Sequence, residues 1–105
     1  MHPHLIIPEP RLWFSALDET HFFSWLESID MIGKVTRVAR GGNQGTGLEL
    51  TFRKKPDEGG IRDLIALMSR YNLDMHCLEV MCTPEHEVWL KDSRMYWFEG
   101  IFGDS

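Results

Sequence analysis

The chain has 105 residues, of which 43% are hydrophobic and 26% charged, and its formal net charge is −5. This length and composition are ordinary for one soluble globular domain spanning residues 1–105. No apolar run approaches the roughly 20 residues of a membrane-spanning helix, and the N-terminus lacks the features of a secretory signal. Two cysteines, Cys77 and Cys82, define no disulfide framework. We therefore expect a cytoplasmic protein with reduced thiols and no membrane contact.

Charge is unevenly distributed along the chain. Residues 34–62 contain seven of the eleven basic residues and three of the sixteen acidic residues, which leaves four basic and thirteen acidic residues elsewhere. Such asymmetry can steer a charged partner toward one face. Basic residues on a hairpin also protect strand edges from pairing with other chains, and the sequence alone does not separate these two explanations.

The first third of the chain predicts two extended segments and a helix. Residues 5–7 are apolar but lie between prolines, which limits them to an extended arm or an edge strand. Residues 11–17 predict the first full strand, because they include aromatic residues that favour extended structure. Asp18 is the candidate N-cap of a helix over residues 19–29. One face of this helix has apolar residues at i, i+3, i+4 and i+7, namely Phe22, Trp25, Leu26 and Ile29.

A glycine-rich loop over residues 41–47 lies between two strand-like segments and predicts a hairpin. Its glycines permit backbone angles that other residues avoid. Residues 34–40 form the first strand of the hairpin. Residues 48–54 form the second and alternate regularly between apolar and polar, so one face packs and the other meets solvent. The apolar face consists of Leu48, Leu50 and Phe52.

Residues 61–71 predict a second helix, and Asn72 is its candidate C-cap. Residues 76–82 are mostly apolar and predict a fourth strand in the centre of the sheet. Residues 87–91 alternate weakly, as in a short fifth strand, and Asp92 is placed to cap a short helix around residues 95–98. The pattern over the last segment fits a strand and a helix equally, but its aromatic density indicates that it docks on the domain.

Together the elements predict an α+β fold. The expected arrangement is a ferredoxin-like βαββαβ sandwich with two helices on one face of an antiparallel sheet and a C-terminal aromatic extension. An α+β sandwich with a different strand order is the alternative.

No catalytic, metal-binding or cofactor-binding pattern stands out. The side chains with metal-binding chemistry are His76, Cys77, Cys82 and His86. On a strand the two cysteines would point to opposite faces and would not converge on a zinc ion. Ser24 and His21 are neighbours on one helix, without the third group and oxyanion hole that nucleophilic catalysis needs. The glycine-rich loop lacks the lysine of a phosphate-binding loop. We therefore expect no enzyme activity, no cofactor and no metal.

A ferredoxin-like domain that binds RNA or a small ligand is the alternative function. An open sheet face can stack bases, and basic hairpin residues can hold phosphates. Those residues are Arg37, Arg40, Arg53 and Lys54. Residues 48–54 present no aromatic pair, however, and the acidic remainder of the chain repels a polyanion.

Acidic and aromatic residues near the C-terminus suit a basic protein partner. Aromatic side chains supply contact energy, and acidic residues accelerate association with a basic surface. The candidate contact residues are Glu85, Glu87, Trp89, Asp92 and Trp97. A packed core is the other explanation for the aromatic residues.

The chain is short, acidic and tryptophan-rich, and it ends in the run Met95-Tyr96-Trp97-Phe98-Glu99-Gly100-Ile101-Phe102-Gly103. In these respects it resembles the small immunity proteins of bacterial contact-dependent and other polymorphic toxin systems. The resemblance implies a cytoplasmic protein that binds a cognate toxin domain, such as a basic nuclease, and blocks its active site or substrate entry. It transfers no residue set, because immunity proteins diverge with their toxins. A homodimer through edge strands is compatible with either function.

Overall fold

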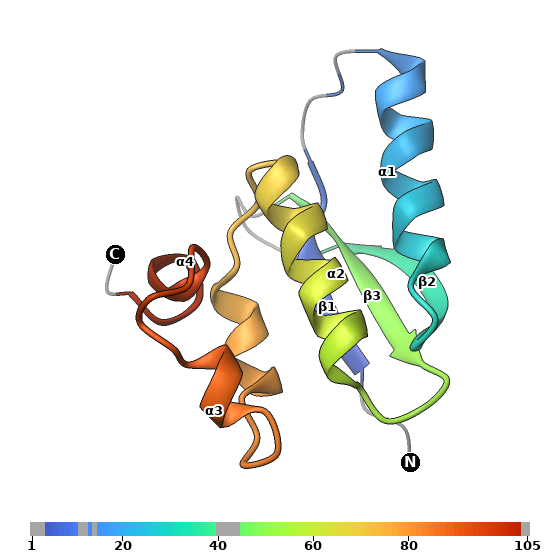
Figure 1. Cartoon of the computed structure of the whole chain (residues 1–105). Coiled ribbons are helices and arrows are strands. Elements are labelled where there is room, and N and C mark those ends of the chain that lie inside the picture. The colour runs from blue at the N-terminus through green and yellow to red at the C-terminus, as the bar shows by residue number, and fades with distance from the viewer. Residues whose placement is uncertain (1–3, 11–12, 14, 40–44, 104–105) are drawn as a thin grey trace.

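Figure 1 shows a three-stranded antiparallel sheet with two long helices, followed by short helical segments toward the C-terminus. This computed structural model describes residues 4–10, 13, 15–39 and 45–103. Most of the predicted glycine-rich loop, residues 41–44, lies outside the described residues. The elements are β1 (His4–Pro8), α1 (Ala16–Ser28), β2 (Ile32–Ala39), β3 (Thr46–Phe52), α2 (Glu58–Arg70), the 3-10 helix η1 (His76–Met81), α3 (Glu87–Leu90) and α4 (Phe98–Phe102).

The sheet has the strand order β1-β3-β2, and both pairings are antiparallel. The alternation predicted over residues 48–54 is confirmed in β3, whose apolar side chains are buried. In the register, Leu5 of β1 lies opposite Leu50, and Ile7 lies opposite Leu48. Because opposite residues in a sheet share a face, these side chains form one apolar face. That face joins the buried side chains of α1 and α2 in a single core.

Helix α1 begins earlier than the sequence predicts. Its N-cap is Ser15, whose hydroxyl accepts a hydrogen bond from the Asp18 backbone N–H at 3.2 Å. The prediction that Asp18 is the N-cap is therefore wrong. Asp18 lies in the first turn instead, where the helix dipole favours a negative charge. The predicted strand over residues 11–17 is wrong at residues 13 and 15–17, while residues 11, 12 and 14 lie outside the described residues.

Helix α2 has a defined cap at each end. It confirms the helix predicted over residues 61–71. Asp57 is the N-cap, and its carboxylate accepts a hydrogen bond from a first-turn N–H at 2.8 Å. The C-cap is Tyr71, so the prediction of Asn72 as the C-cap is wrong by one residue. Asn72 follows it with a φ of 56°, the left-handed conformation that often comes directly after a C-cap. The Leu73 N–H then donates to the Met68 carbonyl oxygen at 2.9 Å, as in a Schellman motif.

The C-terminal third differs most from the prediction. Residues 76–82, predicted as a fourth strand, form the 3-10 helix η1, and residues 87–91, predicted as a short strand, contain α3. In η1 the buried residues Leu78 and Met81 are three positions apart, while Val80 is 68% exposed. This three-residue period is that of a 3-10 helix. The described residues therefore form an α+β fold with three strands, and the ferredoxin-like arrangement is not confirmed.

The aromatic C-terminus docks on the domain, as the sequence predicts. The short helix expected around residues 95–98 lies at Phe98–Phe102. Asp92 accepts a hydrogen bond from the Arg94 N–H at 3.0 Å in a turn, and does not cap a helix. The buried apolar residues of the C-terminal third belong to the common core, and they are Leu78, Met81, Leu90, Trp97 and Ile101.

Candidate partner-binding surface

A row of aromatic rings runs from the buried side of the C-terminal segment to its surface. The His86 imidazole packs edge-to-face on Trp89, with ring centroids 5.6 Å apart. Trp89 packs on Trp97 at 6.0 Å, and Trp97 packs on Tyr96 at 5.1 Å. Edge-to-face pairs contribute about 0.5–1.5 kcal/mol beyond their buried area. These contacts therefore hold the aromatic side chains beneath this part of the surface in fixed positions.

Two further contacts fix the row of rings to the rest of the molecule. Trp97 is 2% exposed, and its indole N–H donates a hydrogen bond to the Leu90 carbonyl oxygen at 2.7 Å. The Arg62 guanidinium of α2 lies 4.8 Å from the ring centroid of Trp89 and 5.2 Å from that of Trp97. Such cation–π contacts are attractive. Arg62 thus joins α2 to the C-terminal segment, a role that no local pattern in the sequence indicates.

Exposed acidic and apolar side chains lie along this row. Glu85 and Glu87 flank His86 in the sequence, and both are exposed. Val88 on α3 is 88% exposed, and Tyr96 at the outer end of the row is 64% exposed. We call Glu85, Glu87, Val88 and Tyr96 the α3 surface. Single exposed apolar side chains are common on proteins, and it is the exposed acids next to Val88 in the sequence that make this surface a candidate.

Three of the predicted contact residues lie at or near this surface. Glu85 and Glu87 belong to it, and Trp89 is half-buried beneath it. The Glu85 carboxylate forms an ion pair with the Lys55 ammonium at 3.0 Å. Because both side chains are exposed, water screens this ion pair and it adds little to stability. Glu85 therefore remains accessible to a basic partner.

The other two predicted contact residues have structural roles. Trp97 is a core residue, so it supports the α3 surface from beneath and does not reach a partner directly. Asp92 forms an ion pair with Arg94 at 2.8 Å, and hydrogen bonds from Arg94 lower the pKa of Asp92 to about 2. Sequence reasoning missed Val88, because the exposure of an apolar side chain depends on how its helix packs.

The basic residues of the alternative function contact other parts of the same chain. The Arg37 guanidinium donates to the Glu9 carboxylate at 2.9 Å and holds the pKa of Glu9 below its ordinary value. Glu9 is 8% exposed and also accepts a hydrogen bond from the Thr46 hydroxyl at 2.7 Å. Arg40 lies outside the described residues.

The two other cations of that set also have partners within the chain. Arg53 donates to the Ile32 carbonyl oxygen at 2.9 Å. Lys54 forms ion pairs with Asp30 at 2.6 Å and with Asp57 at 3.3 Å. A phosphate would have to compete with these oxygen acceptors for the same donors.

The histidines and cysteines of the C-terminal third do not converge. The carbonyl oxygen of Gly103, 2.9 Å from Nε2, and then the carboxylate of Asp74, 2.6 Å from Nδ1, raise the pKa of His76. His86 Nε2 lies 3.1 Å from the Pro56 carbonyl oxygen. Burial raises the pKa of the Cys82 thiol. Within the described ranges, no group of three or more His, Cys, Asp or Glu side chains is placed to hold a metal ion.

Comparison with protein families, with curated proteins and with solved structures finds no match for this chain. Among the residues that the structure describes, no helix has both the length and the apolar character needed to cross a membrane. Inferences about function therefore depend on the side chains of this chain alone.

Proposed function

We propose that this chain is a non-enzymatic, cytoplasmic protein-binding module that acts as an immunity protein. It binds a basic toxin domain and blocks the active site or substrate entry of that domain. The α3 surface carries the proposal, since Glu85 and Glu87 are exposed there beside Val88 and Tyr96. Val88 supplies apolar area directly beside Glu87 in the sequence, and Tyr96 adds area at the end of the ring row.

The physical properties of this surface favour a basic protein. The exposed apolar side chains supply area that a partner can bury, and the ring row beneath Tyr96 reduces the conformational freedom lost on binding. Acidic residues together with the net charge of −5 accelerate encounter with a basic domain. A nuclease toxin fits this description, because its substrate is a polyanion and its binding site is therefore basic.

The RNA- or ligand-binding alternative has less support. Among its candidate residues, Arg37 is paired with the buried Glu9 carboxylate and Arg53 donates to a backbone carbonyl, whereas the ion pairs of Lys54 are exposed and screened like that of Glu85. The ferredoxin-like sheet on which that reading depends would also need a fourth strand. We therefore propose the protein-binding function alone.

The test is whether the polypeptide encoded next to this chain's gene has a toxic domain and whether the chain neutralises it. That domain is expressed in a bacterial host with and without the chain, and growth is measured. The purified pair is then studied by calorimetry at low and high salt. We expect the wild-type chain to restore growth. The variant Glu87→Lys should bind about tenfold more weakly at low salt, because it replaces an attraction by a repulsion, and the loss should shrink at high salt.

The matched control is Glu27→Lys, an equal change of charge at an exposed position on α1. It should leave neutralisation unchanged, because the control position lies outside the α3 surface. If the neighbouring polypeptide is not toxic or does not bind the chain, the proposed function is wrong. Equal binding by wild type and Glu87→Lys at both salt concentrations would remove the α3 surface from the proposal.

A further inference from the structure

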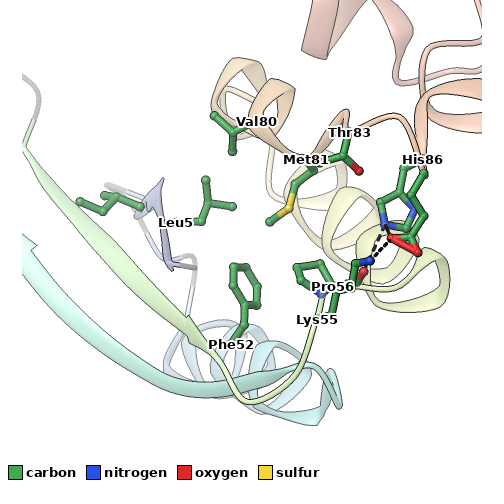
Figure 2. A pocket seen from close by; sticks show the side chains of 10 residues that line it. Leu5, Phe52, Lys55, Pro56, Val80, Met81, Thr83 and His86 are labelled. Carbon is green, nitrogen blue, oxygen red and sulfur yellow. Dashed lines mark hydrogen bonds and ion pairs between the residues drawn. The ribbon is translucent and has the colours of Figure 1, made fainter. Parts of the chain in front are cut away.

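A hollow of about 530 Å³ lies between the sheet and η1 (Figure 2). Leu5 of β1 and Phe52 of β3 form one side, and Val80 and Met81 of η1 face them from the other. The volume is in the range of about 300–1,000 Å³ that is typical of binding sites. It leaves room for more than one apolar side chain.

The lining of the hollow exposes apolar surface to water. Val80 is 68% exposed and Ile6 is 41% exposed, while Leu5 and Phe52 are buried at its sides. Polar groups lie toward one end, where the Lys55 ammonium and the Glu85 carboxylate form their ion pair. Glu85 belongs both to the hollow and to the α3 surface. The two features therefore adjoin.

The hollow also reaches β1, which is an edge strand of the sheet that the described residues form. The Glu9 N–H donates to the Thr46 carbonyl oxygen at 3.3 Å, on the side of β1 that faces β3. Because hydrogen-bonded pairs alternate along an antiparallel ladder, Leu5 and Ile7 also point their backbone groups toward β3. The N–H and carbonyl of Ile6 then point to the open edge of β1. Pro8, which has no N–H to lose, occupies the next edge-facing position.

We propose that this edge and hollow accept an extended segment of the partner protein, which adds to the sheet beside β1. The backbone of Ile6 hydrogen-bonds to the segment, and alternate apolar side chains of the segment enter the hollow between Leu5 and Val80. This inference rests on the proposed function, because the same partner supplies the segment. Main-chain pairing combined with side-chain pockets is a general way to bind an extended peptide.

The charge of the molecule favours a basic extended segment as the occupant of the hollow. Glu85 lines the hollow together with Lys55, its ion-pair partner, and the chain as a whole has a net charge of −5. This negative charge favours a segment with lysine or arginine beside its apolar residues. A second copy of this chain fits less well. Two copies of the chain, each with a net charge of −5, would repel each other.

The probe is the blocked heptapeptide Lys-Leu-Thr-Leu-Thr-Leu-Lys, whose leucines share one face when extended. Binding is followed by NMR shifts of the whole chain. We expect saturable shifts at the Ile6 amide and the Val80 methyl groups. Ile6→Pro should weaken binding about tenfold, because proline removes the edge N–H and adds bulk there. The hydrogen bonds between β1 and β3 are kept, since the backbone of residue 6 takes part in none of them.

Two more variants complete the design. Val80→Asn leaves β1 untouched and should weaken binding about tenfold by removing apolar contact, so the test does not depend on how Ile6→Pro folds. Ala39→Pro is the matched control on the opposite edge strand. Ala39 lies opposite Thr46, whose backbone groups point toward β1, so the Ala39 N–H faces solvent. This control should bind the peptide like the wild type.

Three results would overturn the proposal. They are the absence of saturable shifts at millimolar peptide, equal binding by wild type and Ile6→Pro, and equally tight binding of N-acetyl-leucinamide, which would indicate a small-ligand site. A concentration-dependent dimer that Ile6→Pro abolishes would assign the edge to a second copy and overturn it as well.

Failure of this proposal is distinguishable from failure of the proposed function. If Ile6→Pro and Val80→Asn neutralise the toxin domain normally while Glu87→Lys does not, strand addition is wrong and the α3 surface stands. If the heptapeptide binds as expected but the neighbouring toxin domain does not, the edge accepts a strand and the immunity function is wrong.

Discussion

Replacing Trp97 by phenylalanine tests whether the C-terminal segment is part of the cooperative core. Trp97 is 2% exposed, packs edge-to-face on Trp89 and Tyr96, and donates its indole N–H to the Leu90 carbonyl oxygen. Phenylalanine keeps an aromatic ring at the same place. It loses the hydrogen bond and leaves part of the indole volume empty.

The expected cost follows from these two losses. A buried carbonyl without its partner costs about 1–3 kcal/mol. The missing part of the indole corresponds to one or two methylene groups at about 0.8 kcal/mol each. The edge-to-face contacts are partly retained, so we add no term for them. Trp97→Phe should therefore lower the free energy of unfolding by about 2–4 kcal/mol.

Urea unfolding followed by far-UV circular dichroism measures this loss. With a slope of about 1.5 kcal/mol per molar urea, a loss of 3 kcal/mol lowers the midpoint by about 2 M. The control is Trp25→Phe on α1, at a half-buried position, which should cost less than about 1 kcal/mol. A loss below about 0.5 kcal/mol for Trp97→Phe would contradict the reasoning, because the segment would then unfold separately from the core.

Three further substitutions test the sheet and the start of α2. The hydrogen bond from Arg37 lowers the pKa of Glu9, so its stabilisation is complete above the unfolded value of about 4.3 and is lost as pH falls through the folded value. In urea unfolding the wild type should lose stability below pH 4.3 more steeply than Glu9→Gln; parallel curves would contradict this. A Cβ at Gly60 would lie 2.5 Å from Met31 Sδ, so Gly60→Ala should cost about 1–3 kcal/mol. Gly59→Ala, whose Cβ would meet nothing nearer than 3.9 Å, should instead stabilise by up to about 1 kcal/mol. Equal effects on stability at the two glycines would contradict this, because the Met31 side chain would then move aside at no cost in free energy.

The sequence predicts the elements whose periodicity is long enough to be distinctive. In β3 the alternation over seven residues leaves one choice of buried face, and the four-residue spacing of apolar positions in α2 indicates a helix. The segment 76–82 is different, because a short apolar run fits a strand and a helix. Tertiary contacts decide which of its side chains are buried: Leu78 and Met81 are buried, and Val80 is exposed. A cap can be misread in the same way, since Ser15 and Asp18 are both good N-cap residues.

The candidate surface is predictable only in part for a related reason. Charged residues such as Glu87 are rarely buried, so their exposure follows from composition. The position of a tryptophan depends on its partners: Trp97 is buried because Leu90 offers an acceptor and Arg62 covers its face. Arg62 is far from these residues in sequence, so no local pattern indicates that contact. The exposure of Val88 likewise depends on the orientation of α3.

The replacement of the predicted fourth strand by η1 accounts for the edge and the hollow together. A strand after α2 would have to pair with a free edge of the sheet, and η1 lies against β1. At the end of η1 the Cys82 N–H donates to the Glu79 carbonyl oxygen at 2.9 Å. These backbone groups therefore bond to each other and not to a neighbouring strand. The edge-facing N–H and carbonyl of Ile6 are then left to water or to another chain, and unpaired strand edges attract extended segments. Exposed Val80 beside that edge adds apolar area where such a segment would lie. The same local departure from strand structure therefore removes a predicted element and opens the position where a partner strand can be added.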